Sequence, residues 1–260
     1  MKKIICFLLV GFLICTKAYA NIGVFPQAVD FSENGRKRSQ TLNIINQSKK
    51  IQTYRVSIEE YNQDENGKYV KTKSVANSAQ KYLIYSPKQF TLMPGKVQSI
   101  RIARKGLGDA QDGEYVSHLV VSEVLMPQSE NVTKDNKENN FDVNGDMKEF
   151  SINIRTIFAI SVPVTIYKGK SLKQDTKILS YTQNGDKLNL VLQRKGNISS
   201  RLNFKVLDAK GEEIGRVQSV RIYTPNGKRN LSINLKSGTK PAKLELYDVL
   251  TNKKISEQAL

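Results

Sequence analysis

The sequence predicts an all-β protein made of two β-sandwich domains in tandem. Short runs in which apolar and polar residues alternate recur along the chain, as expected for strands with one buried face. Turn-forming residues, such as Pro94-Gly95 and Asn226-Gly227, separate these runs. No stretch of the 260 residues shows sustained helical periodicity.

The first 20 residues have the pattern of a secretory signal peptide. Lys2 and Lys3 supply a positive start, residues 4–15 an apolar core, and Ala18-Tyr19-Ala20 a small-residue cleavage site. The apolar run is too short to span a bilayer comfortably, and no similar run follows it. We therefore expect export, cleavage after Ala20, and a mature chain without an integral membrane segment.

Charge and cysteine content narrow the possible functions. The predicted signal peptide contains three lysines and no acidic residue, so its removal lowers the net charge from +17 to +14. This basic surface would steer acidic partners, while export argues against a nucleic-acid partner. Both cysteines, Cys6 and Cys15, lie in the signal peptide. The mature chain would therefore have no disulfide, no thiolate metal site and no cysteine nucleophile.

The first predicted domain covers residues 21–168. Seven or eight strands in roughly 150 residues match one immunoglobulin-like sandwich. Turn signals at 33–35, 46–48, 64–67, 94–95 and 112–113 separate most of them. The predicted strands are Gly23–Phe31, Ser39–Asn46, Ile51–Tyr61, Leu83–Tyr85, Gln89–Leu92, Gln98–Ala103, Glu114–Leu125 and Phe150–Tyr167.

The second predicted domain covers residues 169–260 and follows a polar linker at 169–175. Its turns are marked by Asn184-Gly185-Asp186 and Asn226-Gly227. Pro241 precedes the last hairpin, whose tip we expect near Asn252. The predicted strands are Lys177–Thr182, Lys187–Gln193, Arg201–Leu207, Ile214–Ile222, Arg229–Leu235 and Lys243–Val249.

Residues 148–168 contain an apolar strand preceded by the most polar part of the chain, residues 127–147. In an extended segment Phe150, Ile152, Ile154, Phe158 and Ile160 share one face. A solvated loop followed by exposed alternating hydrophobes is what a strand donated to another protein requires. The alternative is an ordinary core strand of a sandwich.

Candidate chemistry is sparse. With one histidine, His118, and no cysteine in the mature chain, neither a zinc site nor a Ser-His-Asp arrangement is easily built. We expect His118 to be a buried, hydrogen-bonded structural residue. There is no glycine-rich phosphate loop, so we expect neither enzymatic activity nor a cofactor. Arg155, in the middle of an apolar strand, must be paired, face solvent, or stand at a cleft where it could hold a carboxylate.

Several motifs, in order, resemble the periplasmic chaperones of chaperone–usher pilus assembly, over essentially the whole mature chain. The motifs are Tyr85-Ser86-Pro87-Lys88-Gln89-Phe90-Thr91-Leu92-Met93-Pro94-Gly95, Ser99-Ile100-Arg101, Asp112-Gly113-Glu114-Tyr115-Val116-Ser117-His118-Leu119, Ile152-Asn153-Ile154-Arg155, Ile160-Ser161-Val162-Pro163-Val164 and Arg194-Lys195-Gly196-Asn197. The resemblance implies tandem immunoglobulin-like domains and a periplasmic location. It also implies that the protein binds pilin or fimbrial subunits by completing their fold, and then delivers them to an outer-membrane usher.

The resemblance also implies a set of binding residues, with one departure. Phe150, Ile152, Ile154 and Phe158 would enter the subunit groove. Well-known members hold the subunit's C-terminal carboxylate with a first-strand arginine and a second basic residue. Here the first-strand position is Gln27, which can donate only a neutral hydrogen bond, and Arg155 is the candidate for the carboxylate contact.

Two other readings stay open. The chain could be a surface or pilin-like structural or adhesive protein built of the same sandwiches, which would predict an anchoring signal or self-association. It could also be a periplasmic ligand-binding or accessory protein, which would require a polar pocket. A chaperone, in contrast, should co-purify with a small β-rich subunit in equimolar amounts.

Overall fold

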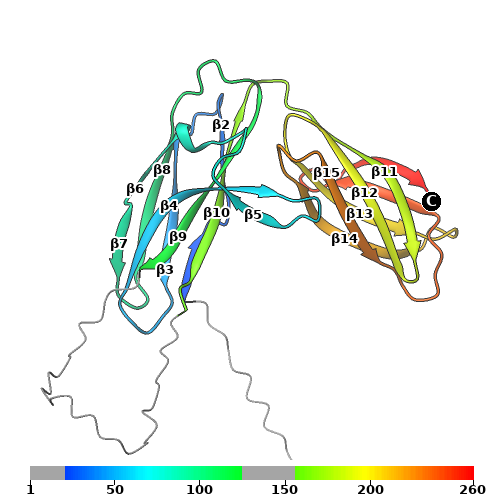
Figure 1. Cartoon of the computed structure of the whole chain (residues 1–260), viewed down its shortest axis with the longest axis horizontal. Coiled ribbons are helices and arrows are strands. Elements are labelled where there is room, and N and C mark those ends of the chain that lie inside the picture. Colours follow the sequence, from blue (N-terminus) through cyan, green and yellow to red (C-terminus); the bar gives the residue numbers. More distant parts are fainter. Residues whose placement is uncertain (1–20, 125–155) are drawn as a thin grey trace, which may run out of the picture.

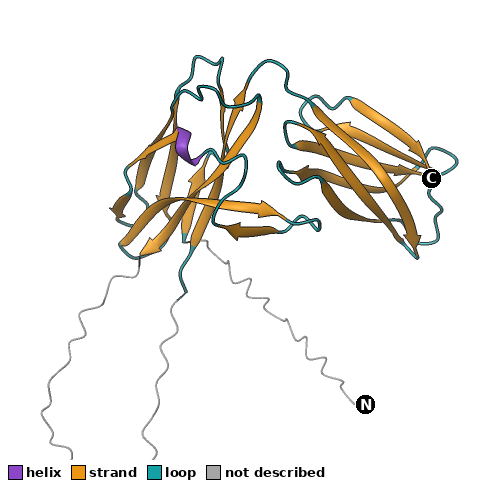
Figure 2. Ribbon diagram, turned by 45° about the horizontal axis from the view of Figure 1, so that its top comes forward, coloured by secondary structure: helices purple, strands orange, loops and turns teal. Residues whose placement is uncertain are grey.

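The structure of the protein is a computed structural model that describes residues 21–124 and 156–260. It confirms the predicted all-β class: two β-sandwiches follow one another along the chain (Figure 1). Within the described residues the only helical element is the single 3-10 turn η1, Gln80–Tyr82 (Figure 2). No helix in these two ranges is long and apolar enough to cross a membrane. The predicted signal peptide lies outside the described residues.

The first sandwich consists of two sheets, with strand orders β1-β3-β8-β6 and β2-β10-β9-β4-β5, and β7 also pairs with β4. All its strand pairs are antiparallel except β10 with β2, which is parallel. Its strands are β1 Ile22–Phe25, β2 Val29–Ser32, β3 Ser39–Asn46, β4 Gln52–Gln63, β5 Tyr69–Thr72, β6 Leu83–Ser86, β7 Gln89–Leu92, β8 Val97–Arg104, β9 Gly113–Val124 and β10 Ala159–Lys168.

The structure corrects the predicted strand Gly23–Phe31. The segment forms two strands, β1 and β2, that belong to opposite sheets. Pro26, Gln27 and Ala28 carry the chain across the edge of the sandwich between them. Proline has no backbone N–H to donate to a sheet, so a continuous ladder through Pro26 would lack one bond. The alternation that continues through the break hid it from sequence reasoning.

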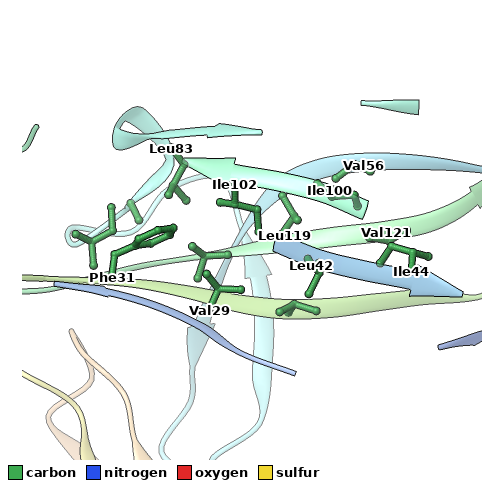
Figure 3. Packing of buried hydrophobic residues seen from close by; sticks show 14 of the residues in the cluster. Val29, Phe31, Leu42, Ile44, Val56, Leu83, Ile100, Ile102, Leu119 and Val121 are labelled. Carbon is green, nitrogen blue, oxygen red and sulfur yellow. The ribbon is translucent and has the colours of Figure 1, made fainter. Parts of the chain in front are cut away.

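The first core lies between these two sheets (Figure 3). Alternate residues of each strand point into it, which is why its sequence pattern has a period of two. Leu42 and Ile44 of β3 face Leu119 and Val121 of β9 across the interior, and all four are buried. Each such side chain contributes about 1.5–3 kcal/mol when fully buried.

The second sandwich has sheets of order β11-β12-β15 and β14-β13-β16-β17, and all of its pairs are antiparallel. Its separate core is built around Phe204, Leu190 and Leu246. The Asn184–Lys187 hairpin turns at Gly185 and Asp186, as predicted. The strands are β11 Gln174–Asn184, β12 Lys187–Gly196, β13 Ser200–Leu207, β14 Glu213–Ile222, β15 Lys228–Asn234, β16 Lys243–Asp248 and β17 Lys254–Ala259.

The β4–β5 hairpin, not predicted from the sequence, extends from the first sandwich to the second (Figure 1). The Asn230 backbone N–H donates to the Glu65 carbonyl at 2.6 Å, and the Asn226 side chain donates to the Asp64 carbonyl at 3.2 Å. No sequence pattern indicates β5, because this strand is short and mostly exposed.

A buried carboxylate also joins the two sandwiches. Glu114 of β9 accepts hydrogen bonds from the Ser199 backbone N–H, at 2.9 Å, and from the Ser199 hydroxyl. The Asn77 amide, from the first sandwich, donates to the Thr224 hydroxyl at 2.6 Å. A buried charge is stabilised by such donors, and these contacts position the second sandwich beside β9 and β10.

Candidate functional site

The most unusual feature of the first sandwich is the incomplete pairing of β10. One edge of β10 pairs with β9 along its whole length, from Ala159 to Lys168. The other edge pairs with β2 only from Val164 to Tyr167. Among the residues that the structure describes, no strand pairs with that second edge between Ala159 and Pro163. A sheet edge open in this way is a template for another strand.

The open stretch presents its backbone groups in a defined order. The Glu123 N–H donates to the Phe158 carbonyl at 3.0 Å, so Phe158 directs its backbone toward β9. Because this direction alternates along an antiparallel pair, Ala159 and Ser161 direct theirs toward the open edge. The Tyr167 carbonyl, of the same parity, accepts from Glu33 N–H on the β2 side, which is consistent with this assignment.

Side chains of β10 connect this edge to the first core. Val162, Val164 and Ile166 are buried in the core, and Ile160 packs against it. Phe158, which precedes the strand and has the parity of these residues, is 39% exposed. The hydrophobic stripe of β10 therefore runs from the core to the surface at the point where the described part of the chain resumes.

A pocket of about 440 Å³ lies next to the open edge, between the two sandwiches. We call it the interdomain pocket. The first sandwich contributes Gln27 and Ala28, and Ser161 and Pro163 of β10. It also contributes Tyr61 of β4, Tyr69 of β5 and His118 of β9. The second sandwich contributes Arg221 of β14 and Tyr223, which follows β14. Within the described lining Arg221 is the one residue with a permanent charge.

Arg221 has no carboxylate partner in the described structure, since none of the ion pairs found there includes it. Its Nη1 donates to the Tyr223 hydroxyl at 2.8 Å. Arg201 lies directly opposite Arg221 on β13 and donates to the Tyr167 hydroxyl at 3.1 Å. Two like charges directly opposite are unfavourable in a sheet. Arg221 is therefore the group in this pocket that can hold an anion.

His118 is buried, as predicted, and within the described ranges one of its two ring nitrogens lacks the predicted hydrogen bond. Its Nδ1 is buried without a hydrogen-bond partner, and its ring contacts the edges of Tyr61 and Tyr69, with centroids 4.9 and 5.9 Å away. Burial lowers the pKa of His118 to about 4, so the ring is neutral at pH 7. Burial, followed by the hydrogen bond to Glu59, raises the pKa of Tyr61 to about 12. The pocket walls are thus uncharged apart from Arg221.

Of the residues proposed from the sequence, the structure places two. Gln27 lines the interdomain pocket, and Phe158 lies exposed immediately before β10. Phe150, Ile152, Ile154 and Arg155 lie outside the described residues. Sequence reasoning missed Arg221, because its strand carries no signal beyond alternation and only the packing of the two sandwiches brings it next to Gln27.

Comparisons with known proteins bear on the fold. No protein-family model matches the sequence, and no curated protein is detectably similar to it. Among solved structures, one match is the complex of CsuC and CsuE, a chaperone–tip adhesion subunit pre-assembly complex from the archaic chaperone–usher Csu pili of Acinetobacter baumannii. The identity is 15%, the TM-score 0.52, and the alignment covers 92% of this chain and 97% of that chain. Another is the YadV chaperone, at 11% identity and TM-score 0.51, covering 93% of this chain and 100% of that one.

The likeness extends over both sandwiches, since more than nine-tenths of each chain is aligned. At these identities it concerns the arrangement of strands rather than particular side chains. The chain has the tandem two-sandwich fold of the chaperones of chaperone–usher pilus assembly.

Proposed function

We propose that this protein is a periplasmic chaperone that binds pilus or fimbrial subunits by donating a β-strand to their incomplete fold. It then delivers them to an outer-membrane usher. The open edge of β10 between Ala159 and Pro163 is the observation that carries the proposal. In this proposal the donor domain covers residues 21–168 and the second domain residues 169–260.

The open edge suits strand addition for two reasons. Its backbone groups at Ala159 and Ser161 are free for a ladder with an incoming strand, which provides affinity largely independent of sequence. A subunit that lacks a strand exposes its own edge and core and would otherwise aggregate. Pairing with β10 would cover both the open edge and the exposed core of the subunit.

Alternate side chains would provide the specificity. Phe150, Ile152 and Ile154 have the same parity as Ile160 and Val162, whose side chains point toward the core face of β10. If the strand continues upstream, these three side chains fill the groove of the subunit, each contributing about 1.5–3 kcal/mol when fully buried. Phe158, already half-exposed, would be the first residue at the boundary between the two cores.

The interdomain pocket would hold the end of the subunit chain. A terminal carboxylate could receive two parallel hydrogen bonds from the Arg221 guanidinium, which has no acidic partner of its own in the described structure. Gln27, in the same pocket, could add a neutral hydrogen bond. We therefore propose Arg221 for the charged contact that the first-strand position cannot make, with Arg155 as a second candidate.

The test is co-expression of the protein with the fimbrial subunits of its own host, followed by purification from the periplasm. We expect an equimolar complex with a small β-rich subunit. Ile152→Asp and Ile154→Asp should each abolish it, because a charge would enter the apolar groove. Asn153→Asp is the matched control: it adds the same charge on the opposite face and should leave the complex intact.

Two outcomes would contradict the proposal. If Ile152→Asp, Ile154→Asp and Asn153→Asp all retain the complex, these residues do not lie on a donated strand. If no subunit co-purifies with the folded wild-type protein from the periplasm, the chain is better explained as a structural or adhesive surface protein.

A further inference from the structure

The second sandwich has an open edge of its own, at β11. This strand pairs with β12 from Gln174 to Asn184, and no strand in the described ranges pairs with its other side. At 11 residues it is the longest strand of the second sandwich. Long open edges invite pairing with another chain unless something protects them.

The other edges of this sandwich are protected. β17 carries Lys254 and Glu257, which form an ion pair at 2.6 Å. β14 carries Glu213 and Arg216, also paired at 2.6 Å, and its ladder with β13 is interrupted twice. The edge of β15 is capped by the β4–β5 hairpin through the Asn230–Glu65 hydrogen bond. Charges, bulges and covering segments are the usual protections of an edge strand.

β11 lacks these protections over its second half. The stretch Ile178-Leu179-Ser180-Tyr181-Thr182-Gln183-Asn184 contains no charge, no proline and no glycine. A bulge interrupts the ladder at Leu179, but pairing with β12 is regular from Ser180 to Asn184. Leu179 is 49% exposed and Tyr181 is 38% exposed, so two large apolar side chains lie at the unpaired strand.

The hairpin fixes which backbone groups are free. Asn184 and Lys187 flank a two-residue turn and form its closing pair. Counting back by twos, Ser180 and Thr182 direct their backbone groups toward β12, whereas Tyr181 and Gln183 direct theirs toward the open edge. An added strand would therefore bond to Tyr181 and Gln183.

We propose that this edge pairs with the same edge of a second copy of the chain, forming a two-fold symmetric dimer through antiparallel β11 strands. The two-fold axis passes between the two Tyr181 residues, so that the aromatic rings form a cross-strand pair. The open edge is then covered along residues 179–183, and the two β11-β12-β15 sheets become one continuous sheet.

Charge favours a second copy over another occupant. The mature chain is strongly basic overall, which opposes self-association, but the paired stretch is neutral in both copies. Beyond the stretch, the antiparallel arrangement brings Lys177 of each copy beside the Gly185–Asp186 turn of the other. The charged ends are thereby complementary, twice by symmetry.

A cysteine at the two-fold axis provides the sharpest test. In a background with Cys6→Ser and Cys15→Ser, Tyr181→Cys is the sole thiol whether or not the first 20 residues are removed. The Cα atoms of a directly opposite hydrogen-bonded pair are about 5.5 Å apart, within the range of a disulfide. Mild oxidation in a glutathione buffer should convert most of this variant to a covalent dimer.

Controls separate this pairing from random collision. Ile255→Cys, on the protected edge β17, and Leu250→Cys, at a turn, introduce thiols at positions that are 45% and 75% exposed. Both should remain mostly monomeric under the same oxidation. Cross-linking of all three variants at similar rates would overturn the proposal, as would the absence of cross-linking at residue 181.

Sedimentation equilibrium supplies a readout without cysteine. The wild-type protein should associate reversibly to a dimer, and Tyr181→Lys should weaken that association at least tenfold, whereas Ile255→Lys should not change it. A far-UV circular dichroism spectrum like that of the wild type shows that each variant is folded. A wild-type protein that stays monomeric at the highest soluble concentration would overturn the proposal.

Discussion

β10 and β11 follow one another in the chain, and each has an open edge, but the two edges differ in what they present. β10 continues a buried stripe, with Val162 in the core and Phe158 emerging from it. β11 presents a neutral, mostly polar stretch on the outside of its sandwich. The difference shows that an open edge alone does not determine a partner. The side chains that flank the edge do.

The reason lies in what each edge can bury. A strand added to β10 enters beside a hydrophobic core and the interdomain pocket, so it is stabilised only if it brings an apolar groove of its own. A strand added to β11 gains mainly backbone hydrogen bonds and contact with Leu179 and Tyr181. An identical copy of the neutral stretch meets that requirement. We therefore expect client binding at β10 and self-association at β11 to be independent.

The largest expected effect comes from introducing a proline into one open edge or the other. Ser161→Pro removes an N–H from the open side of β10 and should abolish subunit capture while leaving the dimer. Tyr181→Pro removes an N–H from the open side of β11 and should abolish the dimer while leaving capture. Proline in a sheet is tolerated where its missing N–H faces an unpaired side.

Co-purification measures capture and sedimentation measures the dimer in both proline variants. If either variant loses both properties while its circular dichroism spectrum stays native, the two edges are coupled. Client binding at β10 and self-association at β11 would then not be independent.

The next effect concerns the pocket beside β10. Arg221→Ala should weaken subunit binding about 10- to 100-fold, because a charge-assisted hydrogen bond contributes about 1.5–3 kcal/mol. Arg216→Ala, on the same strand but exposed and paired with Glu213, is the matched control and should change little. Titration calorimetry of the purified pair measures both. Equal affinities for wild type and Arg221→Ala would exclude the proposed carboxylate contact.

A third effect is the pH dependence of folding stability that His118, in the pocket, should cause. Burial lowers the pKa of His118 to about 4, below its unfolded value of about 6.5. Below the unfolded pKa the unfolded chain binds a proton that the folded chain does not, so stability falls as pH drops from the unfolded toward the folded pKa. The expected loss between pH 7 and pH 5 is about 2 kcal/mol.

Urea unfolding of wild type and His118→Gln at these two pH values measures the contribution of His118. The variant should lose less stability than the wild type over this interval, because it lacks the titrating ring. Since the chain has a single histidine, the difference between the two proteins isolates it from the carboxylates. Parallel pH dependences would show that the ring is not held neutral in the folded protein.

The smallest effect tests the β4–β5 hairpin that holds the two sandwiches together. Gly67 has φ +84° and Gly95 has φ +71°, so alanine at either position costs about 1–2 kcal/mol. At Gly67 the new Cβ would also clash with the Arg229 guanidinium, whereas at Gly95 it meets nothing within 4 Å. Thermal unfolding should show the larger loss for Gly67→Ala. An equal loss would mean that Arg229 shifts freely and that the hairpin contact is loose.

Sequence patterns were sufficient for most of the fold. The period of two predicted β3 and β7 with their observed bounds, and Asn184-Gly185-Asp186 predicted a hairpin that the structure contains. Such features depend on residues close together in the chain. The same pattern failed at Pro26, where alternation continued across a change of sheet, and at β5, where a mostly exposed strand has no apolar period to detect.

The candidate site divides in the same way. The sequence by itself determined the all-β class, the apolar stripe leading into β10, and Gln27 at a position where the resemblance implies an arginine. Only the tertiary structure decided that β2 stops pairing at Val164, and that Arg221 reaches the pocket beside Gln27. The physical reason is that local alternation encodes which face of a strand is buried. Which strand lies at each edge, and which charges meet between sandwiches, depends on packing among residues far apart in the chain.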